Sequence, residues 1–176
     1  MDLREKKTKR SLHNAFLAIR AKKPLEKITI KELCEQAEIS KATFYLHYRD
    51  IYDLSERMQL EVIENIIKYM NDPKDLIYEP VNASKKLIQG FYANRSFINI
   101  LFSGSQFSKL PEIIESRIKE SLFSRFPALE NDVYANVRIT YQLMGSFYSF
   151  YKYENTFGFD GVMNSVEMIT RLFEKK

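Results

Sequence analysis

Residues 28–50 read ITIKELCEQAEISKATFYLHYRD, and this stretch decides the fold of the N-terminal region. Its first part, Thr29-Ile-Lys-Glu32, has the spacing of a capping box, in which a threonine hydroxyl and a glutamate satisfy free backbone N–H groups at a helix start. Apolar residues then recur at helical spacing, namely Ile30, Leu33, Cys34 and Ala37. The pattern predicts a short helix that begins after Thr29 and buries one face.

A second short helix is predicted from Lys41 to about Tyr48. Ser40 is a favourable N-cap residue, and Glu38-Ile39 interrupts the apolar pattern before it. Phe44 and Tyr48 are four residues apart, so both side chains can point back into a small core. The other side chains of this helix are then left free to contact a partner.

Two short helices joined by a turn of about four residues form a helix-turn-helix. A longer helix is predicted before them at about residues 3–22, with Pro24 at its end. Its apolar stripe consists of Leu12, Ala15, Phe16 and Ile19. A recognition helix that enters a DNA major groove needs a buried side that fixes its angle and an exposed side that meets bases and phosphates. We therefore predict a DNA-binding domain at residues 1–50, with the motif at about residues 29–48.

The same stretch resembles the DNA-binding domain of the tetracycline-repressor (TetR) family. The most specific part of the resemblance is Ser40-x-x-Thr-Phe-Tyr-x-His-Tyr48, which follows a threonine-capped helix. The close match covers about residues 8–56, and the rest of the chain matches only in general plan. The resemblance implies a homodimeric, all-helical regulator, usually a repressor, in which residues 51–176 form a helical domain for dimerisation and ligand sensing.

The resemblance also implies which residues contact DNA. Thr29 would meet a phosphate from a helix N-terminus, and Ser40 would cap the recognition helix and touch the DNA backbone. Lys41, Ala42 and Thr43 would face base edges or nearby phosphates. Tyr45 would donate a hydrogen bond from its hydroxyl to a phosphate. His47 and Arg49 would contact the flanking DNA backbone. The alternatives are that Tyr45 is an ordinary surface aromatic and His47 an ordinary exposed histidine. His13 is expected on the polar side of the first helix, without a role.

Two positions depart from the family pattern. The family often has glycine in the turn, where this chain has Glu38, so we expect a strained or differently shaped turn. The family also often has a lysine just after the recognition helix, where this chain has Ile51. Arg49 can substitute for that lysine, with a weaker or shifted hold on the DNA backbone.

The charge of the chain is concentrated at its N-terminal end. Residues 1–50 hold 12 Lys and Arg against 7 Asp and Glu, a net +5, whereas the whole chain has a net charge of +4. Such asymmetry indicates a polyanionic partner for that end, or else a solvated basic face. Charge alone does not decide between these two interpretations.

The composition bounds the class of protein. Hydrophobic residues make up 45% and charged residues 28%, which is typical of globular domains, and there are only 5 Gly and 5 Pro. Together with the helical periodicity this predicts an all-α protein of about nine helices. Beyond residue 50 the expected helices span about residues 51–70, 81–93, 96–102, 111–123, 131–153 and 160–173.

Several classes of chemistry are not expected. We find no glycine-rich phosphate loop, no paired-cysteine motif and no nucleophile elbow, so we predict that the protein is not an enzyme and has no cofactor. The single Cys34 forms no intramolecular disulfide and supports no metal site; it lies on an apolar face, so burial is expected rather than a redox role. The absence of a secretory signal or a membrane-spanning stretch predicts a cytoplasmic protein with no membrane partner.

Residues 51–176 hold 20 of the 24 aromatic residues. One interpretation is an apolar pocket for a small apolar or aromatic effector, and the alternative is a bulky core plus a dimer interface. If a pocket exists, the polar residues proposed to orient the ligand are Asn99, Gln106, Arg138, Tyr141 and Gln142. The last two helices are expected to pair with those of a second subunit, and Gly145-Ser146 would allow close approach.

The resulting hypothesis is a sequence-specific DNA-binding transcription regulator, a homodimeric repressor that binds a palindromic operator in double-stranded DNA and is released by a small-molecule effector. The alternative is a helical protein-interaction module whose helix-turn-helix no longer binds DNA.

Overall fold

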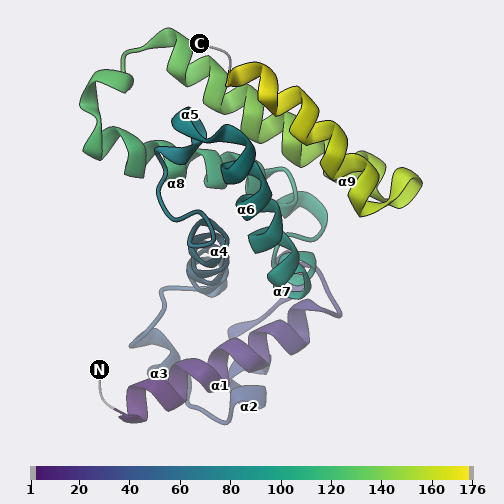
Figure 1. Cartoon of the computed structure of the whole chain (residues 1–176). Helices are drawn as coiled ribbons and strands as arrows, with labels where there is room; N and C mark the ends of the chain where they lie inside the picture. The colour runs from purple at the N-terminus through teal and green to yellow at the C-terminus, as the bar shows by residue number, and fades with distance from the viewer. Residues whose placement is uncertain (1–2, 175–176) are drawn as a thin grey trace. The chain divides into compact units, whose positions relative to one another are not determined.

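The computed structural model describes residues 3–174, and every regular element in that range is a helix (Figure 1). The predicted all-α fold of about nine helices is therefore confirmed. The α-helices are α1 (Leu3–Arg20), α2 (Ile30–Ala37), α3 (Lys41–Tyr45), α4 (Ile51–Ile67), α5 (Asp75–Tyr78), α6 (Pro80–Ala93), α7 (Arg95–Leu101), α8 (Lys109–Arg125) and α9 (Val133–Thr170). Short 3-10 turns join several of them, and α5 is an element that the sequence patterns did not predict.

The chain forms two compact units. The first unit contains the residues up to 62 together with residues 95–107, and the second contains residues 63–94 and those from 108 onward. Helix α4 continues from the first unit into the second. The division into functional domains after residue 50 stays a prediction, because compactness alone does not assign a function to either part.

The first unit is built on α1, α2 and α3, which pack through their apolar stripes. Leu12, Phe16, Leu33 and Phe44 are completely buried. Residues 95–107 join this unit through buried polar side chains: Gln59 donates to the carbonyl of Leu101 at 3.0 Å, and Arg20 donates to the carbonyl of Ser103 at 2.9 Å. These bonds satisfy backbone groups that would otherwise be buried without a partner.

The two C-terminal helices expected at about residues 131–153 and 160–173 are the two halves of α9. Helical backbone is interrupted at Gly158, which has φ 74° and ψ 164°, a region that residues with a side chain rarely adopt. The chain reverses there, and the yellow second half of α9 runs back beside the green first half (Figure 1). A glycine is therefore what allows this helical hairpin.

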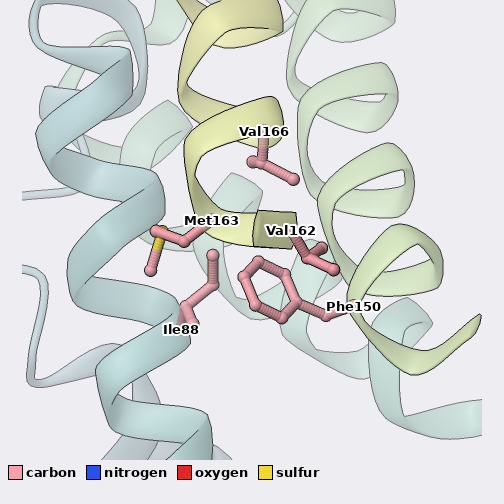
Figure 2. Packing of buried hydrophobic residues seen from close by; sticks show 5 residues of the cluster. All are labelled: Ile88, Phe150, Val162, Met163 and Val166. Carbon is pink, nitrogen blue, oxygen red and sulfur yellow. The ribbon is translucent and has the colours of Figure 1, made fainter. Parts of the chain in front are cut away.

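The hairpin is held closed by an apolar cluster within the second unit (Figure 2). Phe150 from the first half of α9 meets Val162 and Val166 from the second half, and Ile88 of α6 and Met163 complete the cluster. Helix α6 also lies very close to the end of α4. A methyl group added at Gly90 would come within 2.6 Å of the carbonyl oxygen of Ile66, so only glycine permits this approach.

Candidate nucleic-acid interface

The predicted capping box at the start of α2 is present. The hydroxyl of Thr29 accepts a hydrogen bond from the backbone N–H of Glu32 at 3.3 Å, and the Glu32 carboxylate accepts one from the N–H of Thr29 at 2.8 Å. The other oxygen of Glu32 pairs with Lys23, and this contact together with the Thr29 N–H lowers the pKa of the Glu32 carboxyl. The start of α2 is thus fixed, and Thr29 remains exposed beside it.

The turn between α2 and α3 has the strained shape expected from Glu38. This residue adopts left-handed backbone angles, φ 56° and ψ 44°, which cost about 1–2 kcal/mol for a residue with a side chain. The N–H groups of Glu38 and Ile39 both return to the last turn of α2, where Ile39 donates to the Cys34 carbonyl at 3.0 Å. The turn therefore closes in the left-handed conformation without a glycine.

Cys34 is buried, as predicted. Burial also raises the pKa of its thiol, which disfavours the reactive thiolate. The side chain acts as a small apolar group in the core of the helix-turn-helix.

Helix α3, the predicted recognition helix, begins as predicted and ends earlier than predicted. The Ser40 hydroxyl accepts a hydrogen bond from the backbone N–H of Thr43 at 3.0 Å and lies 2.8 Å from the Thr43 hydroxyl. The expected end at about Tyr48 is wrong, because regular α-helix stops at Tyr45. His47 and Tyr48 both donate to the carbonyl of Phe44, which makes a tight turn that still returns Tyr48 to the core.

Phe44 and Tyr48 anchor α3, as predicted. Phe44 is fully buried and Tyr48 is 4% exposed, with 5.8 Å between their ring centres. The prediction for His13 was wrong: it is half-buried, and its Nε2 lies 2.9 Å from the Tyr48 hydroxyl. The reason is that Tyr48 reaches α1 across the small core, which a single-helix pattern does not reveal. Burial lowers the pKa of His13 and raises the pKa of Tyr48 to about 12.

The opposite side of α3 is open. Lys41 and Ala42 are exposed, and Tyr45 is 58% exposed, whereas Thr43 and His47 are half-buried. Arg49, in the loop that follows, has 81% of its side chain exposed. The eight predicted DNA-contacting residues all belong to the first unit; Thr29 lies at the start of α2, and the other seven lie on α3 or directly before and after it. That they bind DNA stays a prediction.

The sequence reasoning missed Leu46, which is 82% exposed at the end of α3. The signal was available, because Leu46 is four residues after Ala42 and so shares its face of the helix. Ile51, at the position where the TetR-like pattern often has lysine, is buried and cannot contact a phosphate.

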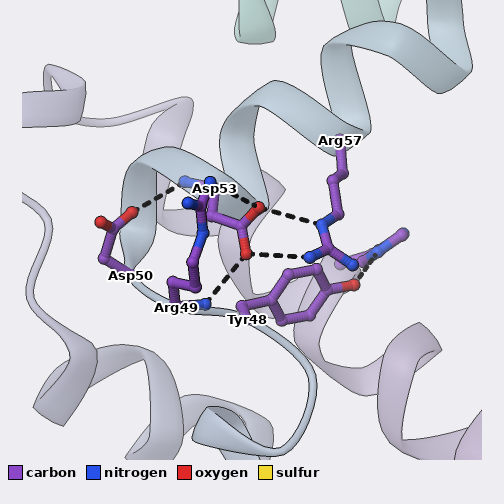
Figure 3. A network of polar contacts seen from close by, with 6 residues as sticks. Tyr48, Arg49, Asp50, Asp53 and Arg57 are labelled. Carbon is purple, nitrogen blue, oxygen red and sulfur yellow. Dashed lines mark hydrogen bonds and ion pairs between the residues drawn. The ribbon is translucent and has the colours of Figure 1, made fainter.

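A carboxylate clamp holds the end of the motif onto α4 (Figure 3). The buried Asp53 accepts hydrogen bonds from the backbone N–H of Arg49 at 2.9 Å and from the guanidinium of Arg57 at 3.0 and 3.1 Å. Asp50 caps α4 by accepting the N–H of Asp53 at 2.8 Å. The Arg49 N–H and the Arg57 guanidinium lower the pKa of Asp53, and Arg57 also lies over the Tyr48 ring at 5.3 Å.

The five residues predicted to orient a ligand are not brought together. Asn99 and Gln106 belong to the first unit, and the other three lie on α9 in the second. Arg138 donates to the carbonyl of Ile77 at 2.8 Å, and Tyr141 is exposed. Gln142 lines an apolar cavity of the second unit, and Tyr141 and Gln142 together line a separate hollow between the two halves of α9.

That cavity has a volume of about 80 Å³ and is walled by α4, α6, α8 and α9. Its apolar wall includes Ile66, Leu87, Phe91, Ile114, Leu143, Phe147 and Phe150. The buried Gln142 amide donates to the carbonyl of Pro80 at 3.0 Å and lies 3.1 Å from the Ser84 hydroxyl. Its oxygen Oε1 is buried and accepts no hydrogen bond from the described residues.

Among residues 3–174 no group of three or more His, Cys, Asp or Glu side chains is arranged to hold a metal ion. In the same range no helix combines the length and the apolar character needed to cross a membrane.

Comparison with known proteins finds one distant relative. The chain is 22% identical over 135 residues to an uncharacterised HTH-type transcriptional regulator, YxbF, of Bacillus subtilis (strain 168). The match covers 72% of this chain and 35% of the relative, so the chain spans about a third of the relative's length. No family model and no solved structure matches the chain. The relationship supports a helix-turn-helix transcription regulator in general.

The Asp53 clamp leads to a stability prediction. Replacing Asp53 with Asn should lower the free energy of unfolding at pH 7 by about 1–3 kcal/mol, because charge-assisted hydrogen bonds to a buried group are lost. The lowered folded-state pKa means that the carboxylate stabilises the fold above the unfolded-state value of about 4 and loses this effect as the pH falls through the folded-state value. Denaturant unfolding should therefore show a difference in the free energy of unfolding between the parent and Asp53→Asn that is smaller at pH 3 than at pH 7. Glu56→Gln, an exposed change on the same helix, is the control and should leave the free energy of unfolding nearly unchanged. If the loss caused by Asp53→Asn were the same at both pH values, the stabilising role of the Asp53 carboxylate would be contradicted.

Proposed function

We propose that the chain is a sequence-specific, DNA-binding transcription regulator of the TetR type. The observation that carries the proposal is the recognition helix α3, which is anchored by Phe44 and Tyr48 on one side and exposes Lys41, Ala42 and Tyr45 on the other. This is the geometry that a helix needs to enter a major groove. The distant relationship to an HTH-type transcriptional regulator supports the same class.

The proposed contacts divide into two kinds. Phosphates are met by Thr29 at the start of α2, by Ser40, by the Tyr45 hydroxyl, and by His47 and Arg49. Base edges are met by the exposed side of α3, namely Lys41, Ala42 and Thr43. The net +5 of residues 1–50 provides the attraction to a polyanion.

The second candidate function is a protein-interaction module that has lost DNA binding. The observation that favours it is Ile51, a buried apolar residue at the position after the recognition helix where the resemblance leads us to expect a lysine. The Asp53 clamp argues for the DNA-binding function, because it fixes the backbone of Arg49 close to that position. The Arg49 guanidinium lies 3.8 Å from Asp53 and still has most of its surface exposed.

A DNA-binding measurement separates the two. Fluorescence anisotropy with genomic duplex fragments at 50–200 mM salt should show an affinity that falls steeply with salt. Tyr45→Phe should weaken binding to all sequences by about fivefold, since one hydrogen bond to a phosphate is lost. Changes at Lys41 or Thr43 should instead alter the sequence preference.

Tyr134→Phe, at an exposed tyrosine of the second unit, is the matched control and should bind DNA as the parent protein does. Salt-independent binding, or no binding to any duplex, would favour the protein-interaction module.

We further propose that the protein is a homodimer formed through α9. The two halves of this helix leave large apolar side chains exposed, namely Val133, Val137, Tyr141, Tyr148, Met168 and Ile169, and Leu172 in the 3-10 turn that follows is exposed as well. The first four share one helical face because they are four or seven residues apart. Large apolar side chains that share an exposed helical face are typical of an interaction site, and a palindromic operator requires two recognition helices related by a two-fold axis.

The double variant Val137→Glu and Tyr141→Glu should convert the dimer to a monomer, because it places charges at the centre of the apolar face. Light scattering coupled to size-exclusion chromatography measures the mass directly. Ser116→Glu, an exposed change on α8, should remain dimeric. A parent protein that is monomeric at micromolar concentration would overturn the dimer proposal.

The most specific part of the proposal is that the protein is a repressor, and that a small apolar or aromatic effector bound in the cavity of the second unit releases it from DNA. At about 80 Å³ the cavity is smaller than the roughly 150 Å³ cavity known to accept benzene, so a one-ring ligand must displace lining side chains. Ile66 of α4 is one of these, and α4 leads into the first unit. The free Gln142 Oε1 favours an effector that carries an N–H or O–H group.

Thermal unfolding with single-ring aromatic compounds tests the effector. A phenol should raise the unfolding temperature more than toluene does. It should also lower the affinity of the protein for DNA, and DNA should lower the affinity of the protein for the phenol by the same factor. Ser146→Phe fills the cavity and should abolish the shift while leaving DNA binding intact. If no such compound changes either quantity, the sensor role is wrong.

A further inference from the structure

We propose that the recognition helix selects thymine through an apolar stripe formed by Ala42 and Leu46, which contacts the C5-methyl groups of thymines in the major groove. The inference rests on the proposed DNA-binding function and adds the base that the helix prefers. It also assigns a specificity-determining role to Leu46.

The stripe follows from the backbone of α3. The N–H of Leu46 donates to the carbonyl of Ala42 at 3.2 Å, so the helical turn extends to Leu46 and places the two side chains one above the other. Both are exposed, Leu46 by 82%, while Phe44 and Tyr48 take the buried side. Lys41 and Tyr45 form a parallel exposed stripe directly beside them.

The exposure of Leu46 has no explanation in the fold. A leucine with most of its surface in water contributes little hydrophobic stabilisation, because that stabilisation scales with the apolar area removed from water. Lys41 precedes the stripe and Arg49 follows it, both exposed, and the first fifty residues carry a net +5. An apolar stripe between cationic side chains is complementary to a partner that carries both negative charges and exposed apolar groups.

Duplex DNA has this combination. The C5-methyl of thymine is the apolar group that base edges present in the major groove. Ala42 is short enough to let the helix approach closely, and the longer Leu46 can cover a methyl group at the next base step. The Thr43 hydroxyl is already engaged with Ser40 at 2.8 Å, which leaves more of the base reading to the neighbouring stripe.

The experiment combines selection with removal of single methyl groups. Duplexes are selected from a random library with the parent protein, and each thymine of the selected site is replaced in turn by uracil, which lacks only the methyl group. Affinities are then measured for the parent, Leu46→Ala and Leu46→Met. The substitutions are at an exposed position, so all three proteins should fold equally well.

The expected result is a thymine in each half-site whose replacement by uracil weakens the parent about fourfold, the effect of one buried methyl group. Leu46→Met keeps the apolar contact and should show the same loss. Leu46→Ala should bind the thymine site more weakly and show little further loss with uracil, because the two changes remove one shared contact.

Three outcomes would overturn the inference. A selected site without such a thymine, or an equal uracil effect in the parent and in Leu46→Ala, removes the methyl contact while leaving the DNA-binding function in place. Failure to enrich any sequence overturns both the inference and the proposed function.

Discussion

The structure of the first unit depends on the burial of Phe44 and Tyr48. Helix α3 has five residues, far fewer than an isolated helix needs to be stable in water, so tertiary anchoring must hold it. The Phe44 ring is completely buried beside the ring of Tyr48, and the Tyr48 hydroxyl reaches His13 of α1. Without these two contacts the exposed residues of α3 would have no fixed orientation toward a partner.

The polar contacts around this anchor act on the ends of the motif. The capping box at Thr29 fixes where α2 starts, and the Ser40 cap fixes where α3 starts. The Asp53 clamp then holds the chain after α3 against α4, through the backbone N–H of Arg49 at 2.9 Å and, more loosely, its guanidinium at 3.8 Å. Arg49 therefore keeps an exposed guanidinium on a fixed backbone, a combination that suits a phosphate contact.

The second unit solves a different problem, which is to bury a large set of aromatic and aliphatic side chains with helices alone. Gly158 lets α9 fold back so that Phe150 meets Val162 and Val166, and Gly90 lets α6 lie directly against the end of α4. Even so, α9 keeps a long apolar face in contact with solvent. A core, a small cavity and an exposed apolar face are all present in the described part of this unit.

The sequence by itself determined the all-α class, the capping box, the two anchors and the side of α3 that faces outward, because these follow from spacings of three and four residues within one helix. Only the tertiary structure decided what depends on groups far apart in the chain. His13 meets Tyr48 across 35 residues, and Gln142 meets Pro80 and Ser84 across about 60. It also showed that Asn99 and Gln106 lie in a different unit from the apolar cavity. Helical periodicity gives the face on which a side chain lies, but not the neighbour that the face will meet.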